Sequence, residues 1–358
     1  MAGPLTTRAA QALLEHSYPL LRAGLFQLDA ETAHHCTLRG METARCAGLL
    51  RLLPATPEAA PVTLWGLRFP NRVGLAAGLD KTGECIDSFA ALGFGFVEIG
   101  TLTPRPQPGN AQPRLFRIVE KEAILNRMGF NNPGIAAGMD HVTRRTWRGI
   151  TGVNIGKNFD TPNERATDDY LTCLRAAWPH ADYVTVNLSS PNTKGLRDLQ
   201  QEETCRALLR ALRAEQETLA QQHQRHVPVL IKIAPDLEDH HIDALARLFV
   251  EEKLEGLIAT NTTLSRRHVE DHPYATQAGG LSGAPLTTRA TAVIARFAKA
   301  LDGALPIIGV GGIMTPAAAV EKLHAGATLI QLYSGLIYHG PALVRECIHS
   351  CAAALQQP

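Results

Sequence analysis

Several residues that could do chemistry stand within or directly after short apolar segments of the chain. Lys232 lies inside the apolar run 229–234, where an ammonium is costly to bury unless an anion meets it. That anion could belong to a ligand or to the protein itself. Gly311-Gly312 and Tyr333-Ser334-Gly335 follow two later apolar runs. Backbone N–H groups at such turns can hold a phosphate, although glycine pairs also form ordinary turns.

Other polar residues follow the remaining apolar runs. Asp80-Lys81, Asn154, the segment 187–192 (NLSSPN) and Asn261 each stand where a run ends. Enzymes built on parallel barrels place their catalytic residues at the carboxyl ends of the strands. These residues are therefore candidates for one common site.

The elements that must position these residues form a regular series from residue 73 onward. Most of the apolar runs are continuously hydrophobic, which is typical of parallel strands buried on both faces. Amphipathic helical patterns separate them, with a proline near three of the helix starts. Strands are expected at 73–76, 94–100, 150–155, 183–188, 229–233, 256–260, 306–310 and 328–333. Helices are expected at 84–92, 134–146, 167–178, 199–222, 237–253, 286–301, 316–325 and 341–355.

Eight strand-then-helix units predict an α/β fold, the (β/α)8 TIM barrel. The alternative is an open doubly wound sheet, but no G-x-G-x-x-G follows the first strand to support dinucleotide binding. Two connections, 101–132 and 262–284, are too long for ordinary barrel loops. Long loops at the carboxyl face of a barrel are where sites are built, so we expect both to border the site.

The composition narrows the class of protein. The chain has 358 residues, with 35 Lys+Arg against 34 Asp+Glu, which argues against a nucleic-acid binder. Hydrophobic residues make up 45% and charged residues 19%, as in a globular protein. The seven cysteines are scattered without a C-x-x-C pair, so we expect reduced thiols inside a cell and no metal site. No transmembrane segment, secretion signal or import signal is predicted.

The first 55 residues precede the barrel and have a helical, leucine-rich pattern. One interpretation is a pair of helices packed on the side of the barrel. The other is an amphipathic cap that dips into a bilayer or admits an apolar ligand.

Nine ordered motifs make the chain resemble the dihydroorotate dehydrogenases of pyrimidine synthesis, specifically the membrane-associated, quinone-dependent class. The resemblance extends from about residue 25 to the end of the chain. The motifs are GLAAGLDK at 74–81, EIGTLTPRPQPGN at 98–110, NRMGFNN at 126–132, GVNIGK at 152–157, NLSSPNT at 187–193, IKIAPD at 231–236, ATNTT at 259–263, GGLSG at 279–283 and GVGGI at 309–313.

The resemblance implies one FMN per chain lying across the barrel mouth, with dihydroorotate stacked on it. The implied FMN-binding residues are Ala77, Gly78, Lys81, Thr101, Asn154, Asn187, Lys232, Thr260, Gly283, Gly312, Tyr333 and Ser334. The implied substrate-binding residues are Lys81, Asn126, Arg127, Met128, Gly129, Phe130, Asn187, Asn192, Asn261 and Thr262. Asparagines can offer donors and acceptors to a cyclic urea, and a cation can meet the substrate carboxylate.

Ser190 resembles the family's catalytic base, and the soluble classes carry cysteine at that position. A serine is weakly basic, so it must relay the proton onward to water or to a neighbour. Residues 56–358 would form the FMN-binding catalytic barrel, and residues 1–55 the extension through which ubiquinone reaches the flavin. His34 and Arg117 match polar residues near that tunnel, although His35 beside His34 also fits a solvated helix face.

The resemblance also places the protein in the cell. It implies a protein that needs no iron–sulfur subunit and is held peripherally on the cytoplasmic side of a bacterial inner membrane through the N-terminal helices. We also expect a monomer, although the near-neutral charge favours neither a monomer nor a dimer. Two alternatives stay open: an FMN barrel oxidoreductase acting on another cyclic or hydroxy acid, and a membrane-bound scaffold without activity. Dihydroorotate would not reduce the flavin in the first, and the second predicts loss of Ser190, Lys81 or Lys232, all of which are present.

Overall fold

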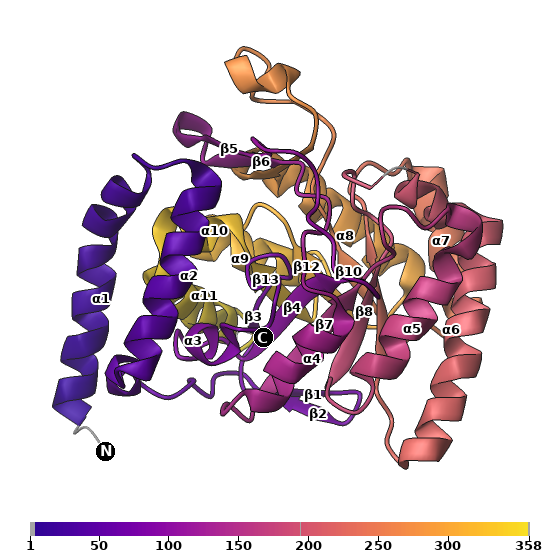
Figure 1. Ribbon diagram of the computed structural model, residues 1–358, viewed down its shortest axis with the longest axis horizontal. Coiled ribbons are helices and arrows are strands. Elements are labelled where there is room, and N and C mark those ends of the chain that lie inside the picture. The colour runs from indigo at the N-terminus through magenta and orange to yellow at the C-terminus, as the bar shows by residue number, and fades with distance from the viewer. Residues whose placement is uncertain (1–3, 194, 357–358) are drawn as a thin grey trace.

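Eight parallel strands close into a barrel in the computed structural model, which describes residues 4–193 and 195–356 (Figure 1). Every residue of these strands is buried, because helices cover the outside of the barrel and side chains fill the inside. This accounts for the continuous apolar runs and confirms the barrel. In barrel order, starting from the first strand along the chain, they are β3 (Val73–Leu75), β4 (Phe96–Leu102), β7 (Ile150–Ile155), β8 (Tyr183–Asn187), β9 (Val229–Ile233), β10 (Gly256–Ala259), β12 (Ile307–Val310) and β13 (Leu329–Leu332).

Helices follow the strands and pack their apolar faces against the barrel. Leu208, Leu212 and Leu219 of the longest outer helix are buried, as its helical periodicity predicts. Except for α10, which was not expected, these helices lie within a few residues of the expected ranges. They are α3 (Ile86–Ala90), α4 (Ile135–Arg144), α5 (Ala166–Ala177), α6 (Glu202–His223), α7 (Asp239–Glu251), α8 (Thr287–Leu301), α9 (Pro316–His324), α10 (Ser334–His339) and α11 (Pro341–Ala354).

The two long connections are not loops alone but build one small antiparallel sheet. The first supplies β5 (Leu115–Ile118) and β6 (Ala123–Asn126), and the second supplies β11 (Gly280–Gly283). β6 pairs with both neighbours, so that Asn126 lies opposite Gly280 and Leu115. These strands were not expected because each is short and because β6 and β11, which pair with each other, lie about 150 residues apart in the chain. The sheet fixes the position of Asn126.

A hairpin closes the opposite, amino-terminal end of the barrel. It is formed by β1 (Val62–Leu64) and β2 (Leu67–Phe69), which pair antiparallel. Phe69 packs edge-on against Phe96 inside the barrel, with the ring centroids 5.2 Å apart. The bottom of the barrel is therefore filled with apolar side chains.

The N-terminal extension is an antiparallel pair of helices, α1 (Pro4–Leu25) and α2 (Ala30–Cys46), which lies along one side of the barrel (Figure 1). Asp29 caps α2 by accepting hydrogen bonds from the N–H groups of Glu31 and Thr32. Tyr18 of α1 donates its hydroxyl proton to the carbonyl of Ile337 at 2.7 Å. The helices therefore pack on the side of the barrel. Leucines of α1 nevertheless face away from it, since Leu13 and Leu20 are 72% and 80% exposed.

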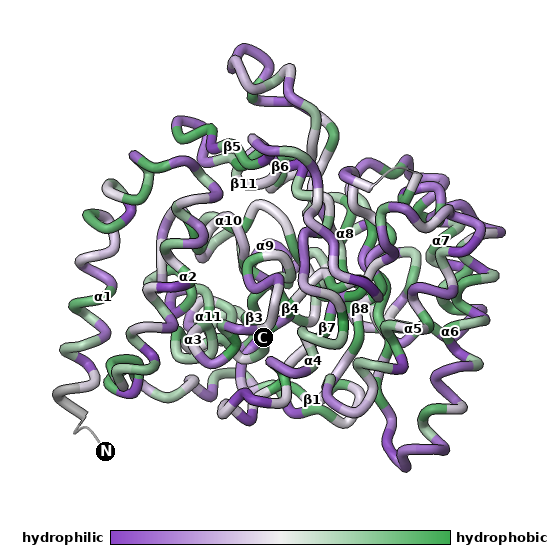
Figure 2. Tube along the Cα trace, in the orientation of Figure 1, coloured by the Kyte–Doolittle hydropathy of each residue, from purple (hydrophilic) through white to green (hydrophobic). Residues whose placement is uncertain are grey.

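Hydrophobic and hydrophilic segments alternate along the trace of α1 (Figure 2). Among the residues that the structure describes, no helix has the length and apolar character needed to cross a membrane.

Candidate active site

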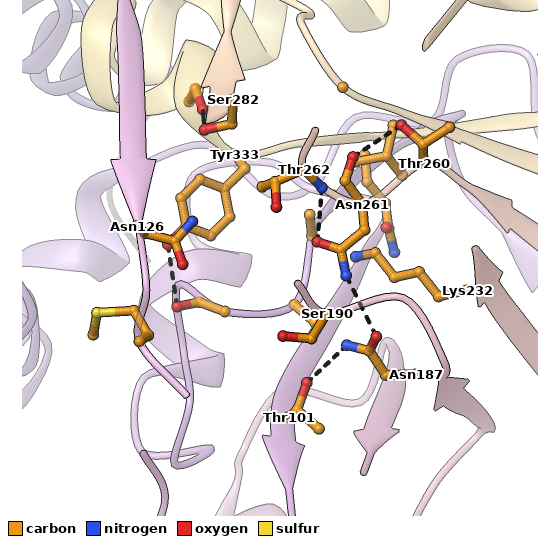
Figure 3. A pocket seen from close by; sticks show the side chains of 18 of the residues that line it. Thr101, Asn126, Asn187, Ser190, Lys232, Thr260, Asn261, Thr262, Ser282 and Tyr333 are labelled. Atoms are coloured by element: carbon orange, nitrogen blue, oxygen red, sulfur yellow. Dashed lines mark hydrogen bonds between the residues drawn. The ribbon is translucent and has the colours of Figure 1, made fainter. Parts of the chain in front are cut away.

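One cavity opens at the carboxyl ends of the barrel strands and collects most of the predicted site residues (Figure 3). About 1000 Å³ of non-atom space, including the solvent at its open mouth, lies within it. Predicted residues that line it are Ala77, Gly78, Lys81, Thr101, Asn126, Met128, Gly129, Phe130, Asn187, Ser190, Asn192, Lys232, Thr260, Asn261, Thr262, Gly312, Tyr333 and Ser334.

Asparagine amides form a connected polar network in this cavity. The Asn261 amide donates to Asn187 Oδ1 at 3.3 Å and to the Ser189 hydroxyl at 3.0 Å. On the other side, the Asn192 amide donates to Asn126 Oδ1 at 3.1 Å. These bonds fix which end of each amide faces inward. The cavity therefore presents donors and acceptors in set positions, which suits a small ring that carries both N–H and C=O groups.

Ser190 lies on the loop after β8, beside this network, and is 5% exposed. Its Oγ accepts a hydrogen bond from the backbone N–H of Asn192 at 3.2 Å. No histidine or carboxylate is bonded to this hydroxyl among the described residues. A proton taken up by Ser190 would therefore have to pass to water or to a ligand group.

Lys232 points into the cavity from β9 (Figure 3). It is 5% exposed, and its ammonium makes no hydrogen bond among the described residues. Burial lowers its pKa, while the charge of Glu98 acts in the opposite direction. Since Glu98 forms no ion pair with Lys232 in the described part of the chain, the lysine is free to meet an electron-rich group of a ligand.

Glu98 lies beneath the cavity in the barrel interior and is fully buried. Its carboxylate accepts hydrogen bonds from Asn154 Nδ2 at 2.9 Å, the Tyr183 hydroxyl at 3.0 Å and Gln331 Nε2 at 2.9 Å. The bond to Asn154 turns that amide so that its oxygen accepts from Thr101 Oγ1 at 2.5 Å. Glu98 thus orients the amides directly under the site.

The glycine-rich turn after β12 forms one end of the cavity. Gly312 has φ +70°, and a Cβ there would lie 2.4 Å from the backbone N of Thr287. Only glycine fits this position, because any side chain would clash with the start of α8. Ser334 stands nearby, and its hydroxyl bonds to that of Ser282 at 2.9 Å. This cradle of small residues suits a phosphate group, whose oxygens accept from backbone N–H and hydroxyl donors.

The loop after β3 carries Lys81, whose ammonium donates to the carbonyl of Gly78 at 2.7 Å. Burial lowers the pKa of Lys81 to about 8, although the charge of Glu31 opposes this shift. The preceding Asp80 anchors the loop by accepting from the N–H groups of Gly83 and Cys85. The Lys81 ammonium is therefore held in place at the edge of the cavity, and its pKa lies close to neutral pH.

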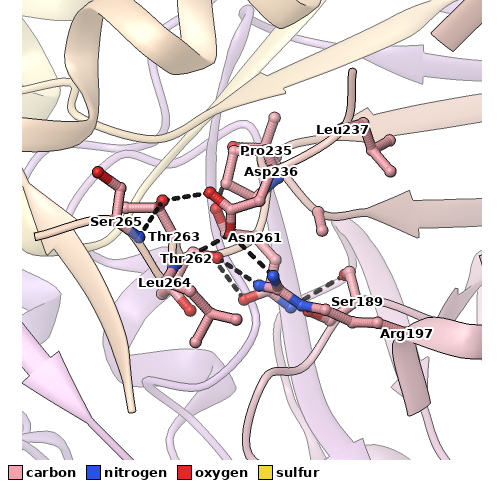
Figure 4. Close-up of polar contacts among 12 residues, drawn as sticks. Ser189, Arg197, Pro235, Asp236, Leu237, Asn261, Thr262, Thr263, Leu264 and Ser265 are labelled. Atoms are coloured by element: carbon pink, nitrogen blue, oxygen red, sulfur yellow. Dashed lines mark hydrogen bonds and ion pairs between the residues drawn. The ribbon is translucent and has the colours of Figure 1, made fainter. Parts of the chain in front are cut away.

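Arg197 ties together the loops that follow β8, β9 and β10 (Figure 4). Its guanidinium donates to the Ser189 carbonyl at 3.1 Å and to the Thr262 carbonyl at 2.9 Å. It also forms an ion pair with Asp236 at 2.8 Å. Asp236 in turn accepts from the hydroxyl of Thr263. The Arg197 guanidinium thus holds the backbone next to Ser190 against the backbone next to Asn261, and the ion pair with Asp236 fixes the guanidinium.

Three residues predicted for this site do not line the cavity. Asn154 lies just behind its wall, where its Oδ1 also accepts from the Asn187 amide at 3.3 Å. Gly283 packs against the carbonyl of Glu122. Arg127 points away from the cavity and donates to Gln277 Oε1 at 2.8 Å.

The two residues assigned to the quinone tunnel lie outside the cavity as well. Arg117 of β5 donates to the carbonyls of Leu25, Phe26 and Leu28, where α1 ends. His34 of α2 lines a separate cavity, which it shares with Lys81. Burial and the charge of Lys81 lower the pKa of His34 well below its usual value, so its imidazole is neutral.

Sequence reasoning missed Glu98, Gln331, Ser282 and Arg197. Glu98 lay within a quoted motif, and a charged residue inside an apolar strand was the same signal that identified Lys232. Gln331 is likewise a polar residue inside an apolar strand, β13, but it carries no charge and so stands out less. Ser282 and Arg197 stand in loops among other polar residues, so only their contacts distinguish them.

Comparison with known proteins gives a consistent result. The chain matches the family model described as dihydroorotate dehydrogenase over residues 59–355. It is 56% identical over 337 residues to a protein of Akkermansia muciniphila named dihydroorotate dehydrogenase (quinone), with 94% of this chain and 97% of that relative covered. A protein of Chromobacterium violaceum with the same name is 58% identical over 339 residues, with 95% and 98% covered.

The fold agrees with solved structures as well. A DHODH of Eimeria tenella, crystallised in complex with ferulenol, matches this chain with a TM-score of 0.83 and 37% sequence identity. The match covers 92% of each chain.

Proposed function

The chain belongs to the dihydroorotate dehydrogenase family, and from this premise we propose that it oxidises (S)-dihydroorotate to orotate in pyrimidine biosynthesis, with a ubiquinone-type quinone as the final electron acceptor. The observation that carries the proposal is the single cavity in which Ser190, Lys232, Gly312 and the asparagine network meet.

The residues present fit FMN as the cofactor. Lys232 is a buried cation without a hydrogen-bond partner among the described residues, and it suits the electron-rich pyrimidine edge of a flavin. The cradle at Gly312 and Ser334 suits the phosphate. When bound, FMN supplies the hydride acceptor for the reaction. Of the residues predicted to bind it, Asn154 and Gly283 would act from behind the wall by orienting Asn187 and β6.

The asparagine network would orient dihydroorotate. The amides of Asn126, Asn187, Asn192 and Asn261 are held by one another and can pair with the ring N–H and C=O groups of a cyclic urea. The Lys81 ammonium would meet the substrate carboxylate. We propose that Arg127 acts on the substrate by supporting the loop, because its guanidinium donates to Gln277 Oε1 and to the Pro113 carbonyl.

Ser190 would act as the base. Oxidation removes a proton from the ring carbon next to a carbonyl and a hydride from the adjacent carbon. The Ser190 hydroxyl takes the proton and releases its own to water, since no protein base is bonded to it among the described residues. Arg197 keeps Ser190 aligned through the carbonyl of Ser189.

The N-terminal helices would provide access for the quinone. The exposed leucines of α1 suit contact with the apolar edge of a bilayer, which would hold the protein peripherally at the cytoplasmic side of a bacterial inner membrane. His34 and Arg117 stay assigned to the quinone path. As a neutral imidazole, His34 would donate its one N–H to a quinone carbonyl, which can only accept.

An anaerobic visible spectrum of the purified protein, recorded before and after addition of dihydroorotate, tests this function. Loss of the oxidised-flavin band is the expected result. A flavin band that does not bleach would keep the flavin barrel but move the substrate to another cyclic or hydroxy acid.

A further inference from the structure

Lys322 is a buried lysine for which the proposed reaction has no role. It lies in α9, and its side chain is 0% exposed. The ammonium donates to the backbone carbonyl of Thr287 at 2.9 Å and to the hydroxyl of Thr291 at 2.5 Å, both in α8. Both acceptors are neutral. No carboxylate forms an ion pair with Lys322 in the part of the chain that the structure describes.

An ammonium in this position is costly unless an anion offsets its charge. Burial lowers the pKa of Lys322 to about 8, and Glu321 on the same helix opposes that shift only from a distance. Lys157, another buried lysine whose ammonium donates to backbone carbonyls, has the charges of Asp169, Asp160 and Glu164 around it. Lys322 therefore lacks the surrounding carboxylates that accompany Lys157.

The position of Lys322 indicates where its anion would be. Thr287, whose carbonyl accepts from the Lys322 ammonium, also donates its hydroxyl to the carbonyl of Gly312 at 2.7 Å. The backbone of Gly312 packs directly on Thr287. Gly312 lines the main cavity at the end that suits a phosphate. The ammonium thus lies behind the phosphate cradle, and Thr287 links the two.

We propose that Lys322 is the buried counter-charge for the phosphate group of FMN, acting through space from behind Gly312 and holding the start of α8 in place. The proposal rests on the proposed function, because it requires a phosphate-bearing flavin in this cavity. It assigns to Lys322 a part in discriminating FMN from flavins that lack the phosphate, and no part in the oxidation of dihydroorotate.

The test compares the binding of two flavins by apoprotein. Wild type and Lys322→Met are titrated with FMN and with riboflavin, which has the same ring but no phosphate, and the quenching of flavin fluorescence is followed. The Kd for FMN should rise by at least about tenfold in Lys322→Met, because a charge–charge attraction is lost in a region of low dielectric. The Kd for riboflavin should stay within about twofold of the wild-type value.

Two further variants keep the test decisive. Lys322→Gln is measured alongside, since its amide can still donate to the Thr287 carbonyl if the methionine variant does not fold. Thr291→Val removes a neutral partner of the ammonium but keeps the charge, so it should preserve the preference for FMN.

The outcomes separate the two proposals. Equal weakening of both flavins in the Lys322 variants, or no change in either, would overturn the role of Lys322. A wild-type protein that binds neither flavin, or binds both equally well, would instead contradict the FMN assignment itself.

Discussion

At the scale of single residues, the site depends on which groups can carry or release a proton. Ser190→Ala removes the hydroxyl that we propose as the base but leaves the hydrogen bonds of the asparagine network in place. Flavin reduction by dihydroorotate should slow by roughly 10²–10⁴-fold, the usual contribution of general base catalysis. FMN content should be unchanged. Stopped-flow absorbance measures the rate, and an unchanged rate would remove Ser190 from this role.

Lys81 should make substrate binding depend on pH. Its pKa of about 8 means that the ammonium is charged below pH 8 and is lost as the pH rises through that value. The Kd for orotate, read from the perturbed flavin spectrum, should therefore be flat below pH 7 and rise about tenfold per unit above pH 8. In Lys81→Met the Kd should be high and nearly independent of pH. If the rise persists in that variant, another group such as Lys232 causes it.

At the scale of elements, loops from separate strands are locked together by single side chains. Arg197→Lys cannot reach the carbonyls of Ser189 and Thr262 and the Asp236 carboxylate at the same time. We expect flavin reduction to slow by roughly ten- to a hundredfold, because Ser190 and Asn261 lose their mutual alignment. FMN binding should be retained, and stopped-flow kinetics with a flavin-content assay distinguish the two effects.

Arg289→Lys is the matched control for that variant. Arg289 also donates to backbone carbonyls of the loop after β9, those of Pro235 and Leu237, but it touches neither Ser189 nor Thr262. If both variants slow flavin reduction equally, general loosening of the loop is the cause and Arg197 has no specific positioning role.

The attachment of the N-terminal helices depends on a buried ion pair. Glu31 of α2 and Arg114, which precedes β5, are joined by several bonds, the shortest at 2.7 Å, with side chains only 6% and 9% exposed. Although burial alone would raise the pKa of Glu31, Arg114 holds it below its usual value. Glu31→Gln should lower the free energy of unfolding by roughly 3–5 kcal/mol, since it leaves a buried guanidinium unpaired.

Urea unfolding measures this change. Glu58→Gln serves as the control, because its ion pair with Arg68 is exposed on the surface and should contribute nothing measurable. A stability loss in Glu31→Gln no larger than in the control would show that the buried pair does not secure α2.

At the scale of the whole molecule, the apolar exposure of α1 should matter only when a membrane and a quinone are present. Leu13→Ser with Leu20→Ser removes two leucines of that helix that are 72% and 80% exposed. Binding to phospholipid vesicles, measured by co-sedimentation, should fall by at least about tenfold. Reduction of a membrane quinone should fall with it, whereas reduction of a soluble dye should be unchanged. Leu355→Ser, at the other end of the chain and 46% exposed, is the control.

The sequence determined the barrel and predicted most of the residues that line the cavity at its carboxyl end. Buried strands must be apolar throughout, so runs such as 229–233 were visible without any partner, and the residues after them had to meet at one end of a closed barrel. For the same reason Asn187, Lys232 and Asn261 were predicted together and do line one cavity. These features follow from local composition and from the fixed direction of parallel strands.

Tertiary structure alone decided the contacts between segments far apart in the chain. The sheet of β5, β6 and β11 joins two connections that no local pattern marks as strands. The sequence also did not reveal three features of single side chains. These are the direction in which Arg127 points, the loops that Arg197 joins and the unpaired charge of Lys322 behind Gly312. Each depends on which neighbours surround a polar side chain, and burial and pairing are properties of the packed molecule rather than of the residue.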